Sequence, residues 1–232
     1  MRNSISVVIP VFNEEDSIVK ECNRIRDALS RAGYQYEIIL VDDCSTDKSL
    51  NFVRGLSYVK TIHLDQRKGS GNARKIGTLE ATGDIVVWTD CDLTYPNHLI
   101  PDIVEEMLKK GYDQVIAARK NESGSWICLR VAAKWIIRKM ACILTHSEIP
   151  DLNSGLRAFR RETCLVYLPL LPEGFSCMAT MTLSYICDQK KVGYFPICSS
   201  NRFGVSKFHP IRDTYKYFVQ TIKVVSHFKH VR

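Results

Sequence analysis

The first half of the chain alternates between short apolar runs and longer stretches with helical periodicity. The runs that predict strands are residues 5–11, 37–41, 59–64 and 85–89. The stretches that predict helices are residues 17–32, a segment ending near residue 56, and residues 72–81. Strands that alternate with helices are typical of a mostly parallel sheet covered on both faces. We therefore expect an α/β fold.

Polar loops follow three of the predicted strands, at residues 12–15, 42–47 and 90–95. Ligands of such sheets bind outside the carboxyl ends of the strands, so these loops should converge on one crevice. The Gly69-Ser70-Gly71 turn lacks both the third glycine of a dinucleotide fingerprint and the Gly-Lys-Ser/Thr of a P-loop. We interpret it as a turn and helix start, with phosphate contact as the alternative.

Asp90 and Asp92 stand two residues apart at the end of the apolar run 84–89. Strand side chains alternate with period two, so both carboxylates should face the same side. Mg²⁺ typically takes one or two protein carboxylates and fills its other positions with substrate phosphates and water. The pair therefore predicts a metal-bridged diphosphate, and a solvated acidic strand end is the alternative.

Two helices are predicted in the second half, at residues 125–146 and 210–232. The first carries Arg130, Lys134 and Arg138 in one row at spacing four. From Lys207 onward, six basic residues stand against the single acid Asp213. Basic helices with apolar faces suit an anionic membrane surface, and a core helix with a solvated basic face is the alternative. No nucleic-acid motif accompanies the charge, so nucleic acid is not an expected partner.

Composition restricts the class of protein. The chain has 232 residues, of which 45% are hydrophobic and 25% charged, with a net charge of +7, as in a globular protein of one large domain. Its nine cysteines include no C-x-x-C pair, which argues for free thiols in a reducing, cytoplasmic compartment. We expect no secretory leader, because the apolar run 7–12 leads directly into an acidic loop. No run of about eighteen uncharged apolar residues predicts a membrane span.

Taken together, these motifs resemble the inverting family-two glycosyltransferases of the GT-A fold. Within them, the chain looks most like the polyprenyl-phosphate sugar synthases, of which dolichyl-phosphate mannose synthase is a type. The matching segments run in order from VVIPVFNEE through VDDCSTD and TDCDLTYP to NRFGVSKF. The residues that the resemblance places around the base and ribose are Pro10, Phe12, Glu14, Val41 and Asp43. It further implies that Asp90 and Asp92 hold the cation and that the backbone of Cys91 lies beside the diphosphate.

The resemblance also assigns residues to the acceptor and the leaving group. Arg119 occupies the diphosphate-side arginine position, and DLNSGLRAFRR resembles the acceptor-side motif, with Asp151, Ser154, Gly155, Arg157 and Arg160. Arg157 and Arg160 are alternatively structural salt-bridge partners. NRFGVSK resembles the late arginine-to-Ser-Lys element, with Arg202, Ser206 and Lys207. It departs from the usual form, which has one more residue between arginine and lysine and a glutamate where Val205 stands.

The nucleophile distinguishes the possible reactions. A sugar hydroxyl needs a general base, whereas a phosphate is already anionic near neutral pH and needs cations to hold it. Between Glu173 and Asp188 the chain has no carboxylate, which favours a phosphate acceptor. The alternatives are transfer to a saccharide or protein hydroxyl, with Asp151 or His209 as the base, and a non-catalytic member that binds nucleotide-sugar or membrane.

The resemblance thus implies transfer of a sugar from GDP-mannose or a UDP-sugar to a polyprenyl or dolichyl phosphate, assisted by Mg²⁺ or Mn²⁺. We expect a peripheral protein on the cytosolic face of a membrane. Residues 1–206 should form the GT-A domain and residues 207–232 a basic amphipathic helix at the membrane surface. Many bacterial relatives continue into transmembrane helices after the Ser-Lys element. We expect this chain to attach peripherally or through a small membrane-anchoring subunit.

Overall fold

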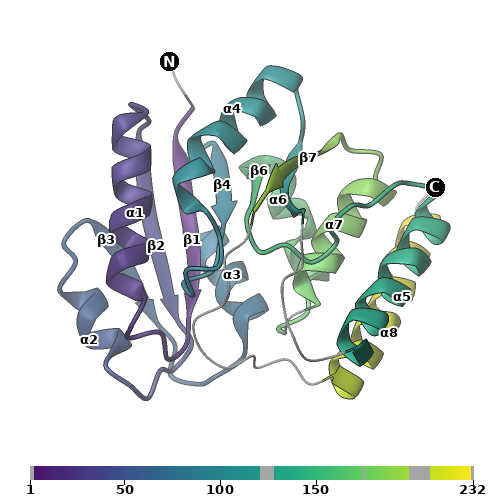
Figure 1. Ribbon diagram of the computed structural model, residues 1–232, viewed down its shortest axis with the longest axis horizontal. Helices are drawn as coiled ribbons and strands as arrows, with labels where there is room; N and C mark the ends of the chain where they lie inside the picture. The colour runs from purple at the N-terminus through teal and green to yellow at the C-terminus, as the bar shows by residue number, and fades with distance from the viewer. Residues whose placement is uncertain (1–2, 121–127, 175, 199–209, 231–232) are drawn as a thin grey trace.

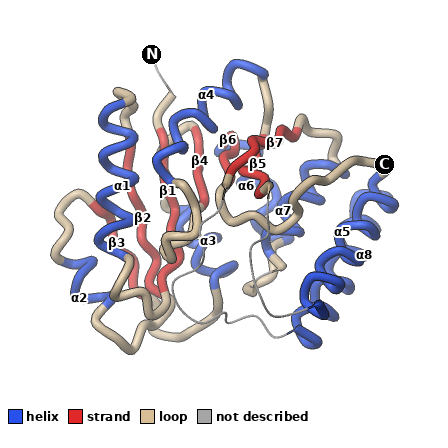
Figure 2. Tube along the Cα trace, in the orientation of Figure 1, coloured by secondary structure: helices blue, strands red, loops and turns tan. Residues whose placement is uncertain are grey.

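The strands in the described part of the chain form one seven-stranded sheet, in the order β3-β2-β1-β4-β6-β5-β7 (Figures 1 and 2). The structure is a computed structural model that describes residues 3–120, 128–174, 176–198 and 210–230. The strands are β1 Ile5–Val11, β2 Tyr36–Asp42, β3 Val59–His63, β4 Ile85–Trp88, β5 Gln114–Arg119, β6 Arg157–Arg160 and β7 Val192–Ile197. β6 pairs antiparallel with β4 and β5, and the other pairings are parallel. The predicted mostly parallel sheet is confirmed.

Helices cover both faces of the sheet, as predicted (Figure 1). The α-helices are α1 Ile18–Arg31, α2 Ser49–Arg54, α3 Ser70–Leu79, α4 Ile100–Lys110, α5 Cys128–Thr145, α6 Arg161–Tyr167, α7 Cys177–Cys187 and α8 Pro210–His230. Alternation along β1 separates two cores, since Val7 packs with residues of α1 and α4 and Val8 with residues of α3, α6 and α7. Both valines are fully buried, as a strand between two helix layers requires.

The helices α5 and α8 form a further layer that lies against α7 (Figure 1). Buried side chains from all three helices share one core, among them Ile137 of α5, Leu183 of α7 and Val224 of α8. None of the described helices combines the length and the apolar character that crossing a membrane requires. The predicted C-terminal amphipathic helix is confirmed in α8, and a domain boundary at 206/207 falls outside the described residues and stays a prediction.

The strand order changes direction at β1, which lies between β2 and β4. Chain segments leaving β1 and β4 diverge at this point, and open α/β sheets bind ligands there. The turn before α3 meets a loop from the second half of the chain. Gly69 has φ +105°, and the Gly71 N–H donates to the Glu173 carbonyl at 2.7 Å. A Cβ on Gly69 would lie 2.7 Å from that carbonyl oxygen, so glycine is required here by this close approach. The interpretation of the Gly-Ser-Gly segment as a turn and helix start is confirmed.

Candidate functional site

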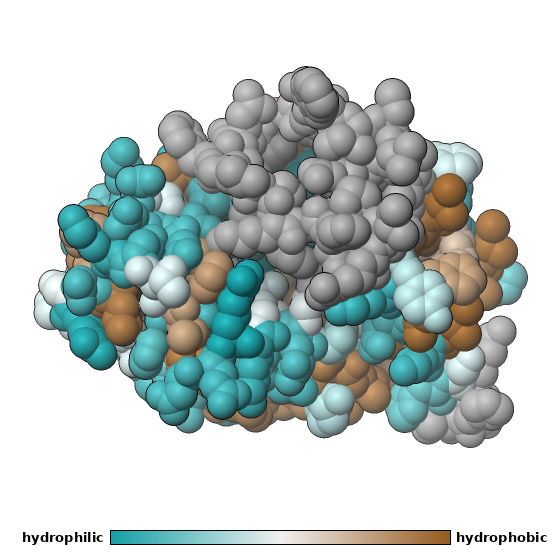
Figure 3. Space-filling view, turned by 90° about the horizontal axis from the view of Figure 1, so that it is seen from below, coloured by the Kyte–Doolittle hydropathy of each residue, from teal (hydrophilic) through white to brown (hydrophobic). Residues whose placement is uncertain are grey.

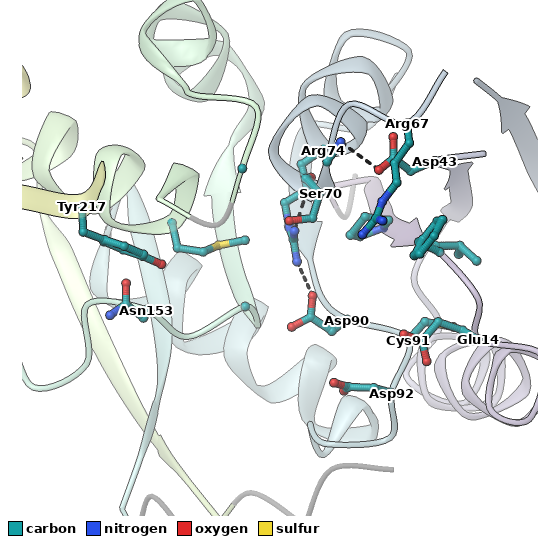
Figure 4. A pocket seen from close by; sticks show the side chains of 17 residues that line it. Glu14, Asp43, Arg67, Ser70, Arg74, Asp90, Cys91, Asp92, Asn153 and Tyr217 are labelled. Atoms are coloured by element: carbon teal, nitrogen blue, oxygen red, sulfur yellow. Dashed lines mark hydrogen bonds and ion pairs between the residues drawn. The ribbon is translucent and has the colours of Figure 1, made fainter. Parts of the chain in front are cut away.

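A pocket of about 190 Å³ opens at the carboxyl ends of β1, β2 and β4 (Figure 4). The predicted residues that line it are Pro10, Phe12, Glu14, Asp43, Asp90, Cys91, Asp92 and Gly155. The three loops expected to converge therefore do so. Eight of the predicted residues share one cavity with residues from α3, from the loop before β6, and from α7 and α8.

One end of the pocket is built from Phe12, Asp43 and Arg67. The Arg67 guanidinium lies 3.8 Å from the centroid of the Phe12 ring, a cation–π contact. The main-chain N–H groups of Lys68 and Gly69 each donate to the Asp43 carboxylate at 2.8 Å. These bonds fix the carboxylate, and the aromatic ring offers a flat apolar surface. A flat ring beside a fixed hydrogen-bond acceptor is suited to a nucleobase.

The acidic pair lines another part of the same pocket. The Asp90 side chain is 35% exposed, whereas Asp92 is buried and accepts a hydrogen bond from the Thr94 N–H at 3.2 Å. Between them, burial raises the pKa of the Cys91 thiol well above its usual range, so the thiol stays protonated. Leu93 adopts φ +59°, a turn that carries the chain away from the strand.

The donor set suits a hard divalent cation. Two carboxylates line one cavity, and no group of three or more His, Cys, Asp or Glu side chains in the described residues could hold a metal alone. That pattern fits an ion that completes its coordination with phosphate oxygens and water. It does not fit a closed structural zinc site, which takes four protein ligands.

Arg74 is a pocket residue that sequence reasoning missed. It projects from α3, is 2% exposed, and forms an ion pair with Asp90 (Figure 4). Its Nη1 donates to the Ser70 carbonyl at 3.4 Å. The signal in the sequence is an arginine that follows Gly71 and Ala73 on a helix face otherwise made of small residues, which is a face that packs closely against its neighbour.

Arg119, predicted beside the diphosphate, is not among the residues that line the pocket. Its guanidinium donates to both oxygens of Asp151, at 2.7 Å and 3.0 Å. Burial raises the pKa of Asp151, but the hydrogen bonds and charge of Arg119 outweigh it, so the net shift is downward. Asp151 is therefore a weak base. The role of Arg119 at the diphosphate stays a prediction.

Three other predicted residues are buried away from the cavity. Val41 packs in the core against α3, and Ser154 is fully buried. Arg157 is also fully buried, and it donates to the carbonyls of Ser154 and Met178 and to the Thr182 hydroxyl. Burial lowers the pKa of Arg157 to about 10, so it remains charged near neutral pH. These contacts favour the structural alternative for Arg157, which ties the loop before β6 to α7.

The wall opposite Glu14 and Asp43 comes from the second half of the chain (Figure 4). Its residues are Asn153, Gly155, Gly174, Met178 and Tyr217. Tyr217 of α8 and Asn153 lie beside each other, across the cavity from Arg74 and Asp90 (Figure 4). Sequence reasoning assigned neither of them to the site. Arg202, Ser206 and Lys207 lie outside the described residues, so their predicted roles stay predictions.

Comparison with known proteins gives matches of three kinds. Residues 6–164 match the model of the family described as glycosyl transferase family 2. A curated relative named undecaprenyl-phosphate 4-deoxy-4-formamido-L-arabinose transferase, from Enterobacter sp. (strain 638), is 34% identical over 165 residues, which are 69% of this chain and 50% of that protein. The protein of the same name from Proteus mirabilis is 35% identical over 165 residues, with the same coverage. The chain spans about half the length of these curated relatives.

A solved structure resembles the whole described fold. Glucosyl-3-phosphoglycerate synthase from Mycobacterium tuberculosis, in complex with Mn²⁺, UDP-glucose and phosphoglyceric acid, superposes with a TM-score of 0.72 at 19% identity. The match covers 97% of this chain and 80% of that one. The predicted GT-A fold is confirmed by this similarity.

Proposed function

Since the chain belongs to glycosyl transferase family 2, we propose that it transfers a sugar from a nucleotide-sugar to a polyprenyl phosphate at a membrane surface. The observation that carries the proposal is the composition of one pocket. Its donor side holds an aromatic ring, a fixed carboxylate and an acidic pair, and its opposite wall contains no carboxylate among the described lining residues. GDP-mannose and UDP-sugars are the candidate donors.

On the donor side, the aromatic ring of Phe12 and the fixed carboxylate of Asp43 support the base and ribose. Asp90 and Asp92 would hold Mg²⁺ or Mn²⁺ against the diphosphate. When bound, such an ion neutralises the negative charge that develops on the departing nucleoside diphosphate. Arg74 adds a cation at the same end of the pocket, where charge-assisted hydrogen bonds to phosphate are strong.

On the acceptor side, the described lining residues include no base, which supports a phosphate nucleophile; the candidate base His209 lies outside the described residues. Gly155, Met178, Asn153 and Tyr217 line this wall, and none of these side chains accepts a proton near neutral pH. The candidate base Asp151 is ion-paired with Arg119 and has a lowered pKa. A phosphate oxygen attacks without losing a proton, so such a wall suffices. The curated relatives are named undecaprenyl-phosphate 4-deoxy-4-formamido-L-arabinose transferases, which supports a polyprenyl phosphate as the acceptor.

The outer face of α5 and α8 supports action at a membrane surface. We define the α5/α8 face by its exposed large hydrophobic side chains: Trp135, Ile136 and Ile143 on α5, and Tyr215, Phe218 and Ile222 on α8. Apolar residues gather at this end of the molecule (Figure 3). The exposed Lys139, Lys216 and Lys223 are interspersed among them. A face with aromatic, aliphatic and basic residues suits anionic lipid headgroups.

Label transfer tests the reaction. The protein is incubated with radiolabelled GDP-mannose or UDP-sugars, polyprenyl phosphate and Mg²⁺ or Mn²⁺, and the organic-extractable product is counted. We expect metal-dependent label in the lipid phase, which identifies the donor. A membrane-anchoring subunit, where one is required, is co-expressed. Donor consumption with hydroxyl acceptors alone contradicts the base-free argument, and donor binding without turnover favours a non-catalytic role.

Vesicle sedimentation tests the membrane face. Serine at Tyr215, Phe218 and Ile222 should release the protein from anionic vesicles, because each change removes apolar area from the α5/α8 face. Serine at Leu79 and Val166, which are 58% and 67% exposed on other surfaces, is the matched control and should leave binding unchanged. If both variants sediment equally with the vesicles, the α5/α8 face does not bind the membrane and its apolar residues have only a structural role.

A further inference from the structure

Arg74 is a buried cation in the wall of a pocket that is expected to bind a cation. It is 2% exposed, and its partner is Asp90, one of the two carboxylates that suit a metal. Burial of the Arg74 guanidinium costs desolvation free energy, although its partner carboxylate is 35% exposed. Charged groups that are kept in a pocket at such a cost are often functional. Two positive charges, the arginine and the metal, thus compete for one carboxylate.

Asp90 is held on two sides. Its Oδ1 accepts from Arg74, and its Oδ2 lies next to Gly155, where a Cβ would be only 2.5 Å away. The pair with Arg74 therefore fixes the direction of the carboxylate before any ligand arrives. It also offsets the repulsion expected between Asp90 and Asp92 in a metal-free pocket.

The Arg74 guanidinium has hydrogen-bonding capacity left. Its Nε is buried and has no hydrogen-bond partner in the described part of the chain. The guanidinium also lies 5.9 Å from the centroid of the buried Trp88 ring. A buried donor without a partner is costly, and an anionic oxygen entering the pocket would satisfy it.

We infer that Arg74 is a coupling residue between the metal and the diphosphate. Without ligands, it neutralises and orients Asp90 and weakens metal binding. When a metal takes over the charge of Asp90, the guanidinium is released to donate to a diphosphate oxygen. Binding of the metal then raises the affinity for the diphosphate, because it frees Arg74 from Asp90. Binding of the diphosphate raises the affinity for the metal in turn, because it holds Arg74 away from Asp90. This inference rests on the proposed function for the nature of the anion.

The test measures binding and not turnover. Free Mn²⁺ is followed by its electron paramagnetic resonance signal, with and without GDP or UDP, in the wild type and in Arg74→Met. Met preserves the apolar stem and removes the charge. We expect the affinity for Mn²⁺ alone to rise about tenfold, and the affinity for the nucleoside diphosphate in saturating Mn²⁺ to fall at least tenfold, as loss of a charge-assisted hydrogen bond predicts.

If Arg74 has only a structural role, the affinity of Arg74→Met for Mn²⁺ should fall and not rise. If Arg74 only supports Asp90, its loss disorders the carboxylate, and the affinities for Mn²⁺ and for the nucleotide fall together. That result, or unchanged affinities, overturns the inference. Lys75→Met removes a positive charge from the same helix outside the pocket lining and should change neither affinity more than twofold.

Two further results separate this inference from the proposed function. Arg74→Lys keeps the charge but shortens its reach, so it should shift both affinities in the same directions by smaller factors. Arg74→Lys replaces Arg74→Met in the binding experiment if circular dichroism shows that Arg74→Met does not fold. A wild type that binds neither Mn²⁺ nor nucleotide overturns the proposed function itself. A wild type that binds both, with an Arg74 variant that behaves like it, overturns only the coupling.

Discussion

Gly155 offers a way to displace Asp90 without changing its charge. A Cβ at position 155 would lie 2.5 Å from Asp90 Oδ2, 3.1 Å from its Cγ and 3.2 Å from the Tyr95 ring. Ordinary contact begins at 3.4 Å, so the carboxylate oxygen must retreat by about 0.9 Å, the difference between 3.4 Å and 2.5 Å. The Asp90 Cγ and the Tyr95 ring have to move by only about 0.3 Å and 0.2 Å, the differences from 3.4 Å. Because the largest shift falls on the end of a side chain beside a cavity, Gly155→Ala should cost little stability.

The displacement of the Asp90 carboxylate should lower the catalytic rate strongly. A shift of about 1 Å in a positioned group costs on the order of 100-fold in rate, which corresponds to about 2.7 kcal/mol of transition-state stabilisation. We therefore expect Gly155→Ala to lower kcat/KM for the lipid-phosphate reaction by about 100-fold. Much of that loss should appear as a higher Mn²⁺ requirement, since the displaced oxygen belongs to a candidate metal ligand.

Gly174→Ala is the matched control. Gly174 lines the same pocket, and a Cβ there would meet nothing within 4 Å. We expect its kcat/KM to stay within about twofold of the wild type and the thermal midpoint of both variants to stay close to it. The steady-state assay with titrated Mn²⁺ decides the outcome. A Gly155→Ala protein with wild-type kcat/KM and Mn²⁺ dependence would refute the placement of Asp90 in the catalytic site.

Three further predictions concern buried or paired charges. Asp92→Asn should abolish metal-dependent label transfer, because an amide binds a hard cation weakly; near-normal activity removes Asp92 from the mechanism. Arg157→Met should lower the free energy of unfolding in urea by about 2–4 kcal/mol, since buried acceptors lose their donor; a change under about 1 kcal/mol contradicts the structural role. Asp151 has a lowered folded pKa, so its pairing with Arg119 stabilises the fold above the unfolded pKa and is lost as pH falls through the folded value. Asp151→Asn should therefore flatten the fall in stability below about pH 4, and an unaltered acid limb argues against the pairing.

The first four strands were predictable because their signal is local. Each is an apolar run followed by a polar loop, and a buried parallel strand needs nothing else in its sequence. β6 is different. It consists of Arg157, Ala158, Phe159 and Arg160, and it pairs antiparallel between β4 and β5. A four-residue strand with arginine at both ends shows no apolar run, and its place depends on two strands elsewhere in the chain.

The residues of the candidate site likewise fall into those that local sequence predicts and those that tertiary packing places. Asp90 and Asp92 could be predicted because the strand and its period of two place them together. Arg67 and Arg74 follow β3 in the chain. They reach the pocket because α3 packs against β1 and β2, and this packing is tertiary structure that no local sequence pattern shows. The position of Tyr217 is harder still to predict. Within one turn of α8, Tyr217 faces the pocket while the neighbouring aromatic residues Tyr215 and Phe218 face solvent.

The geometry of α8 connects the pocket with the α5/α8 face. Tyr217 is 6% exposed and lines the cavity, whereas Tyr215 is 69% exposed on the outer face. Residues two apart on a helix point in nearly opposite directions, and a helix with its side chains is about 10–12 Å across. If the outer face lies on lipid, the pocket wall therefore lies about one helix diameter from the headgroups. A lipid phosphate could then reach the donor side of the pocket while its polyprenyl chain remains in the membrane.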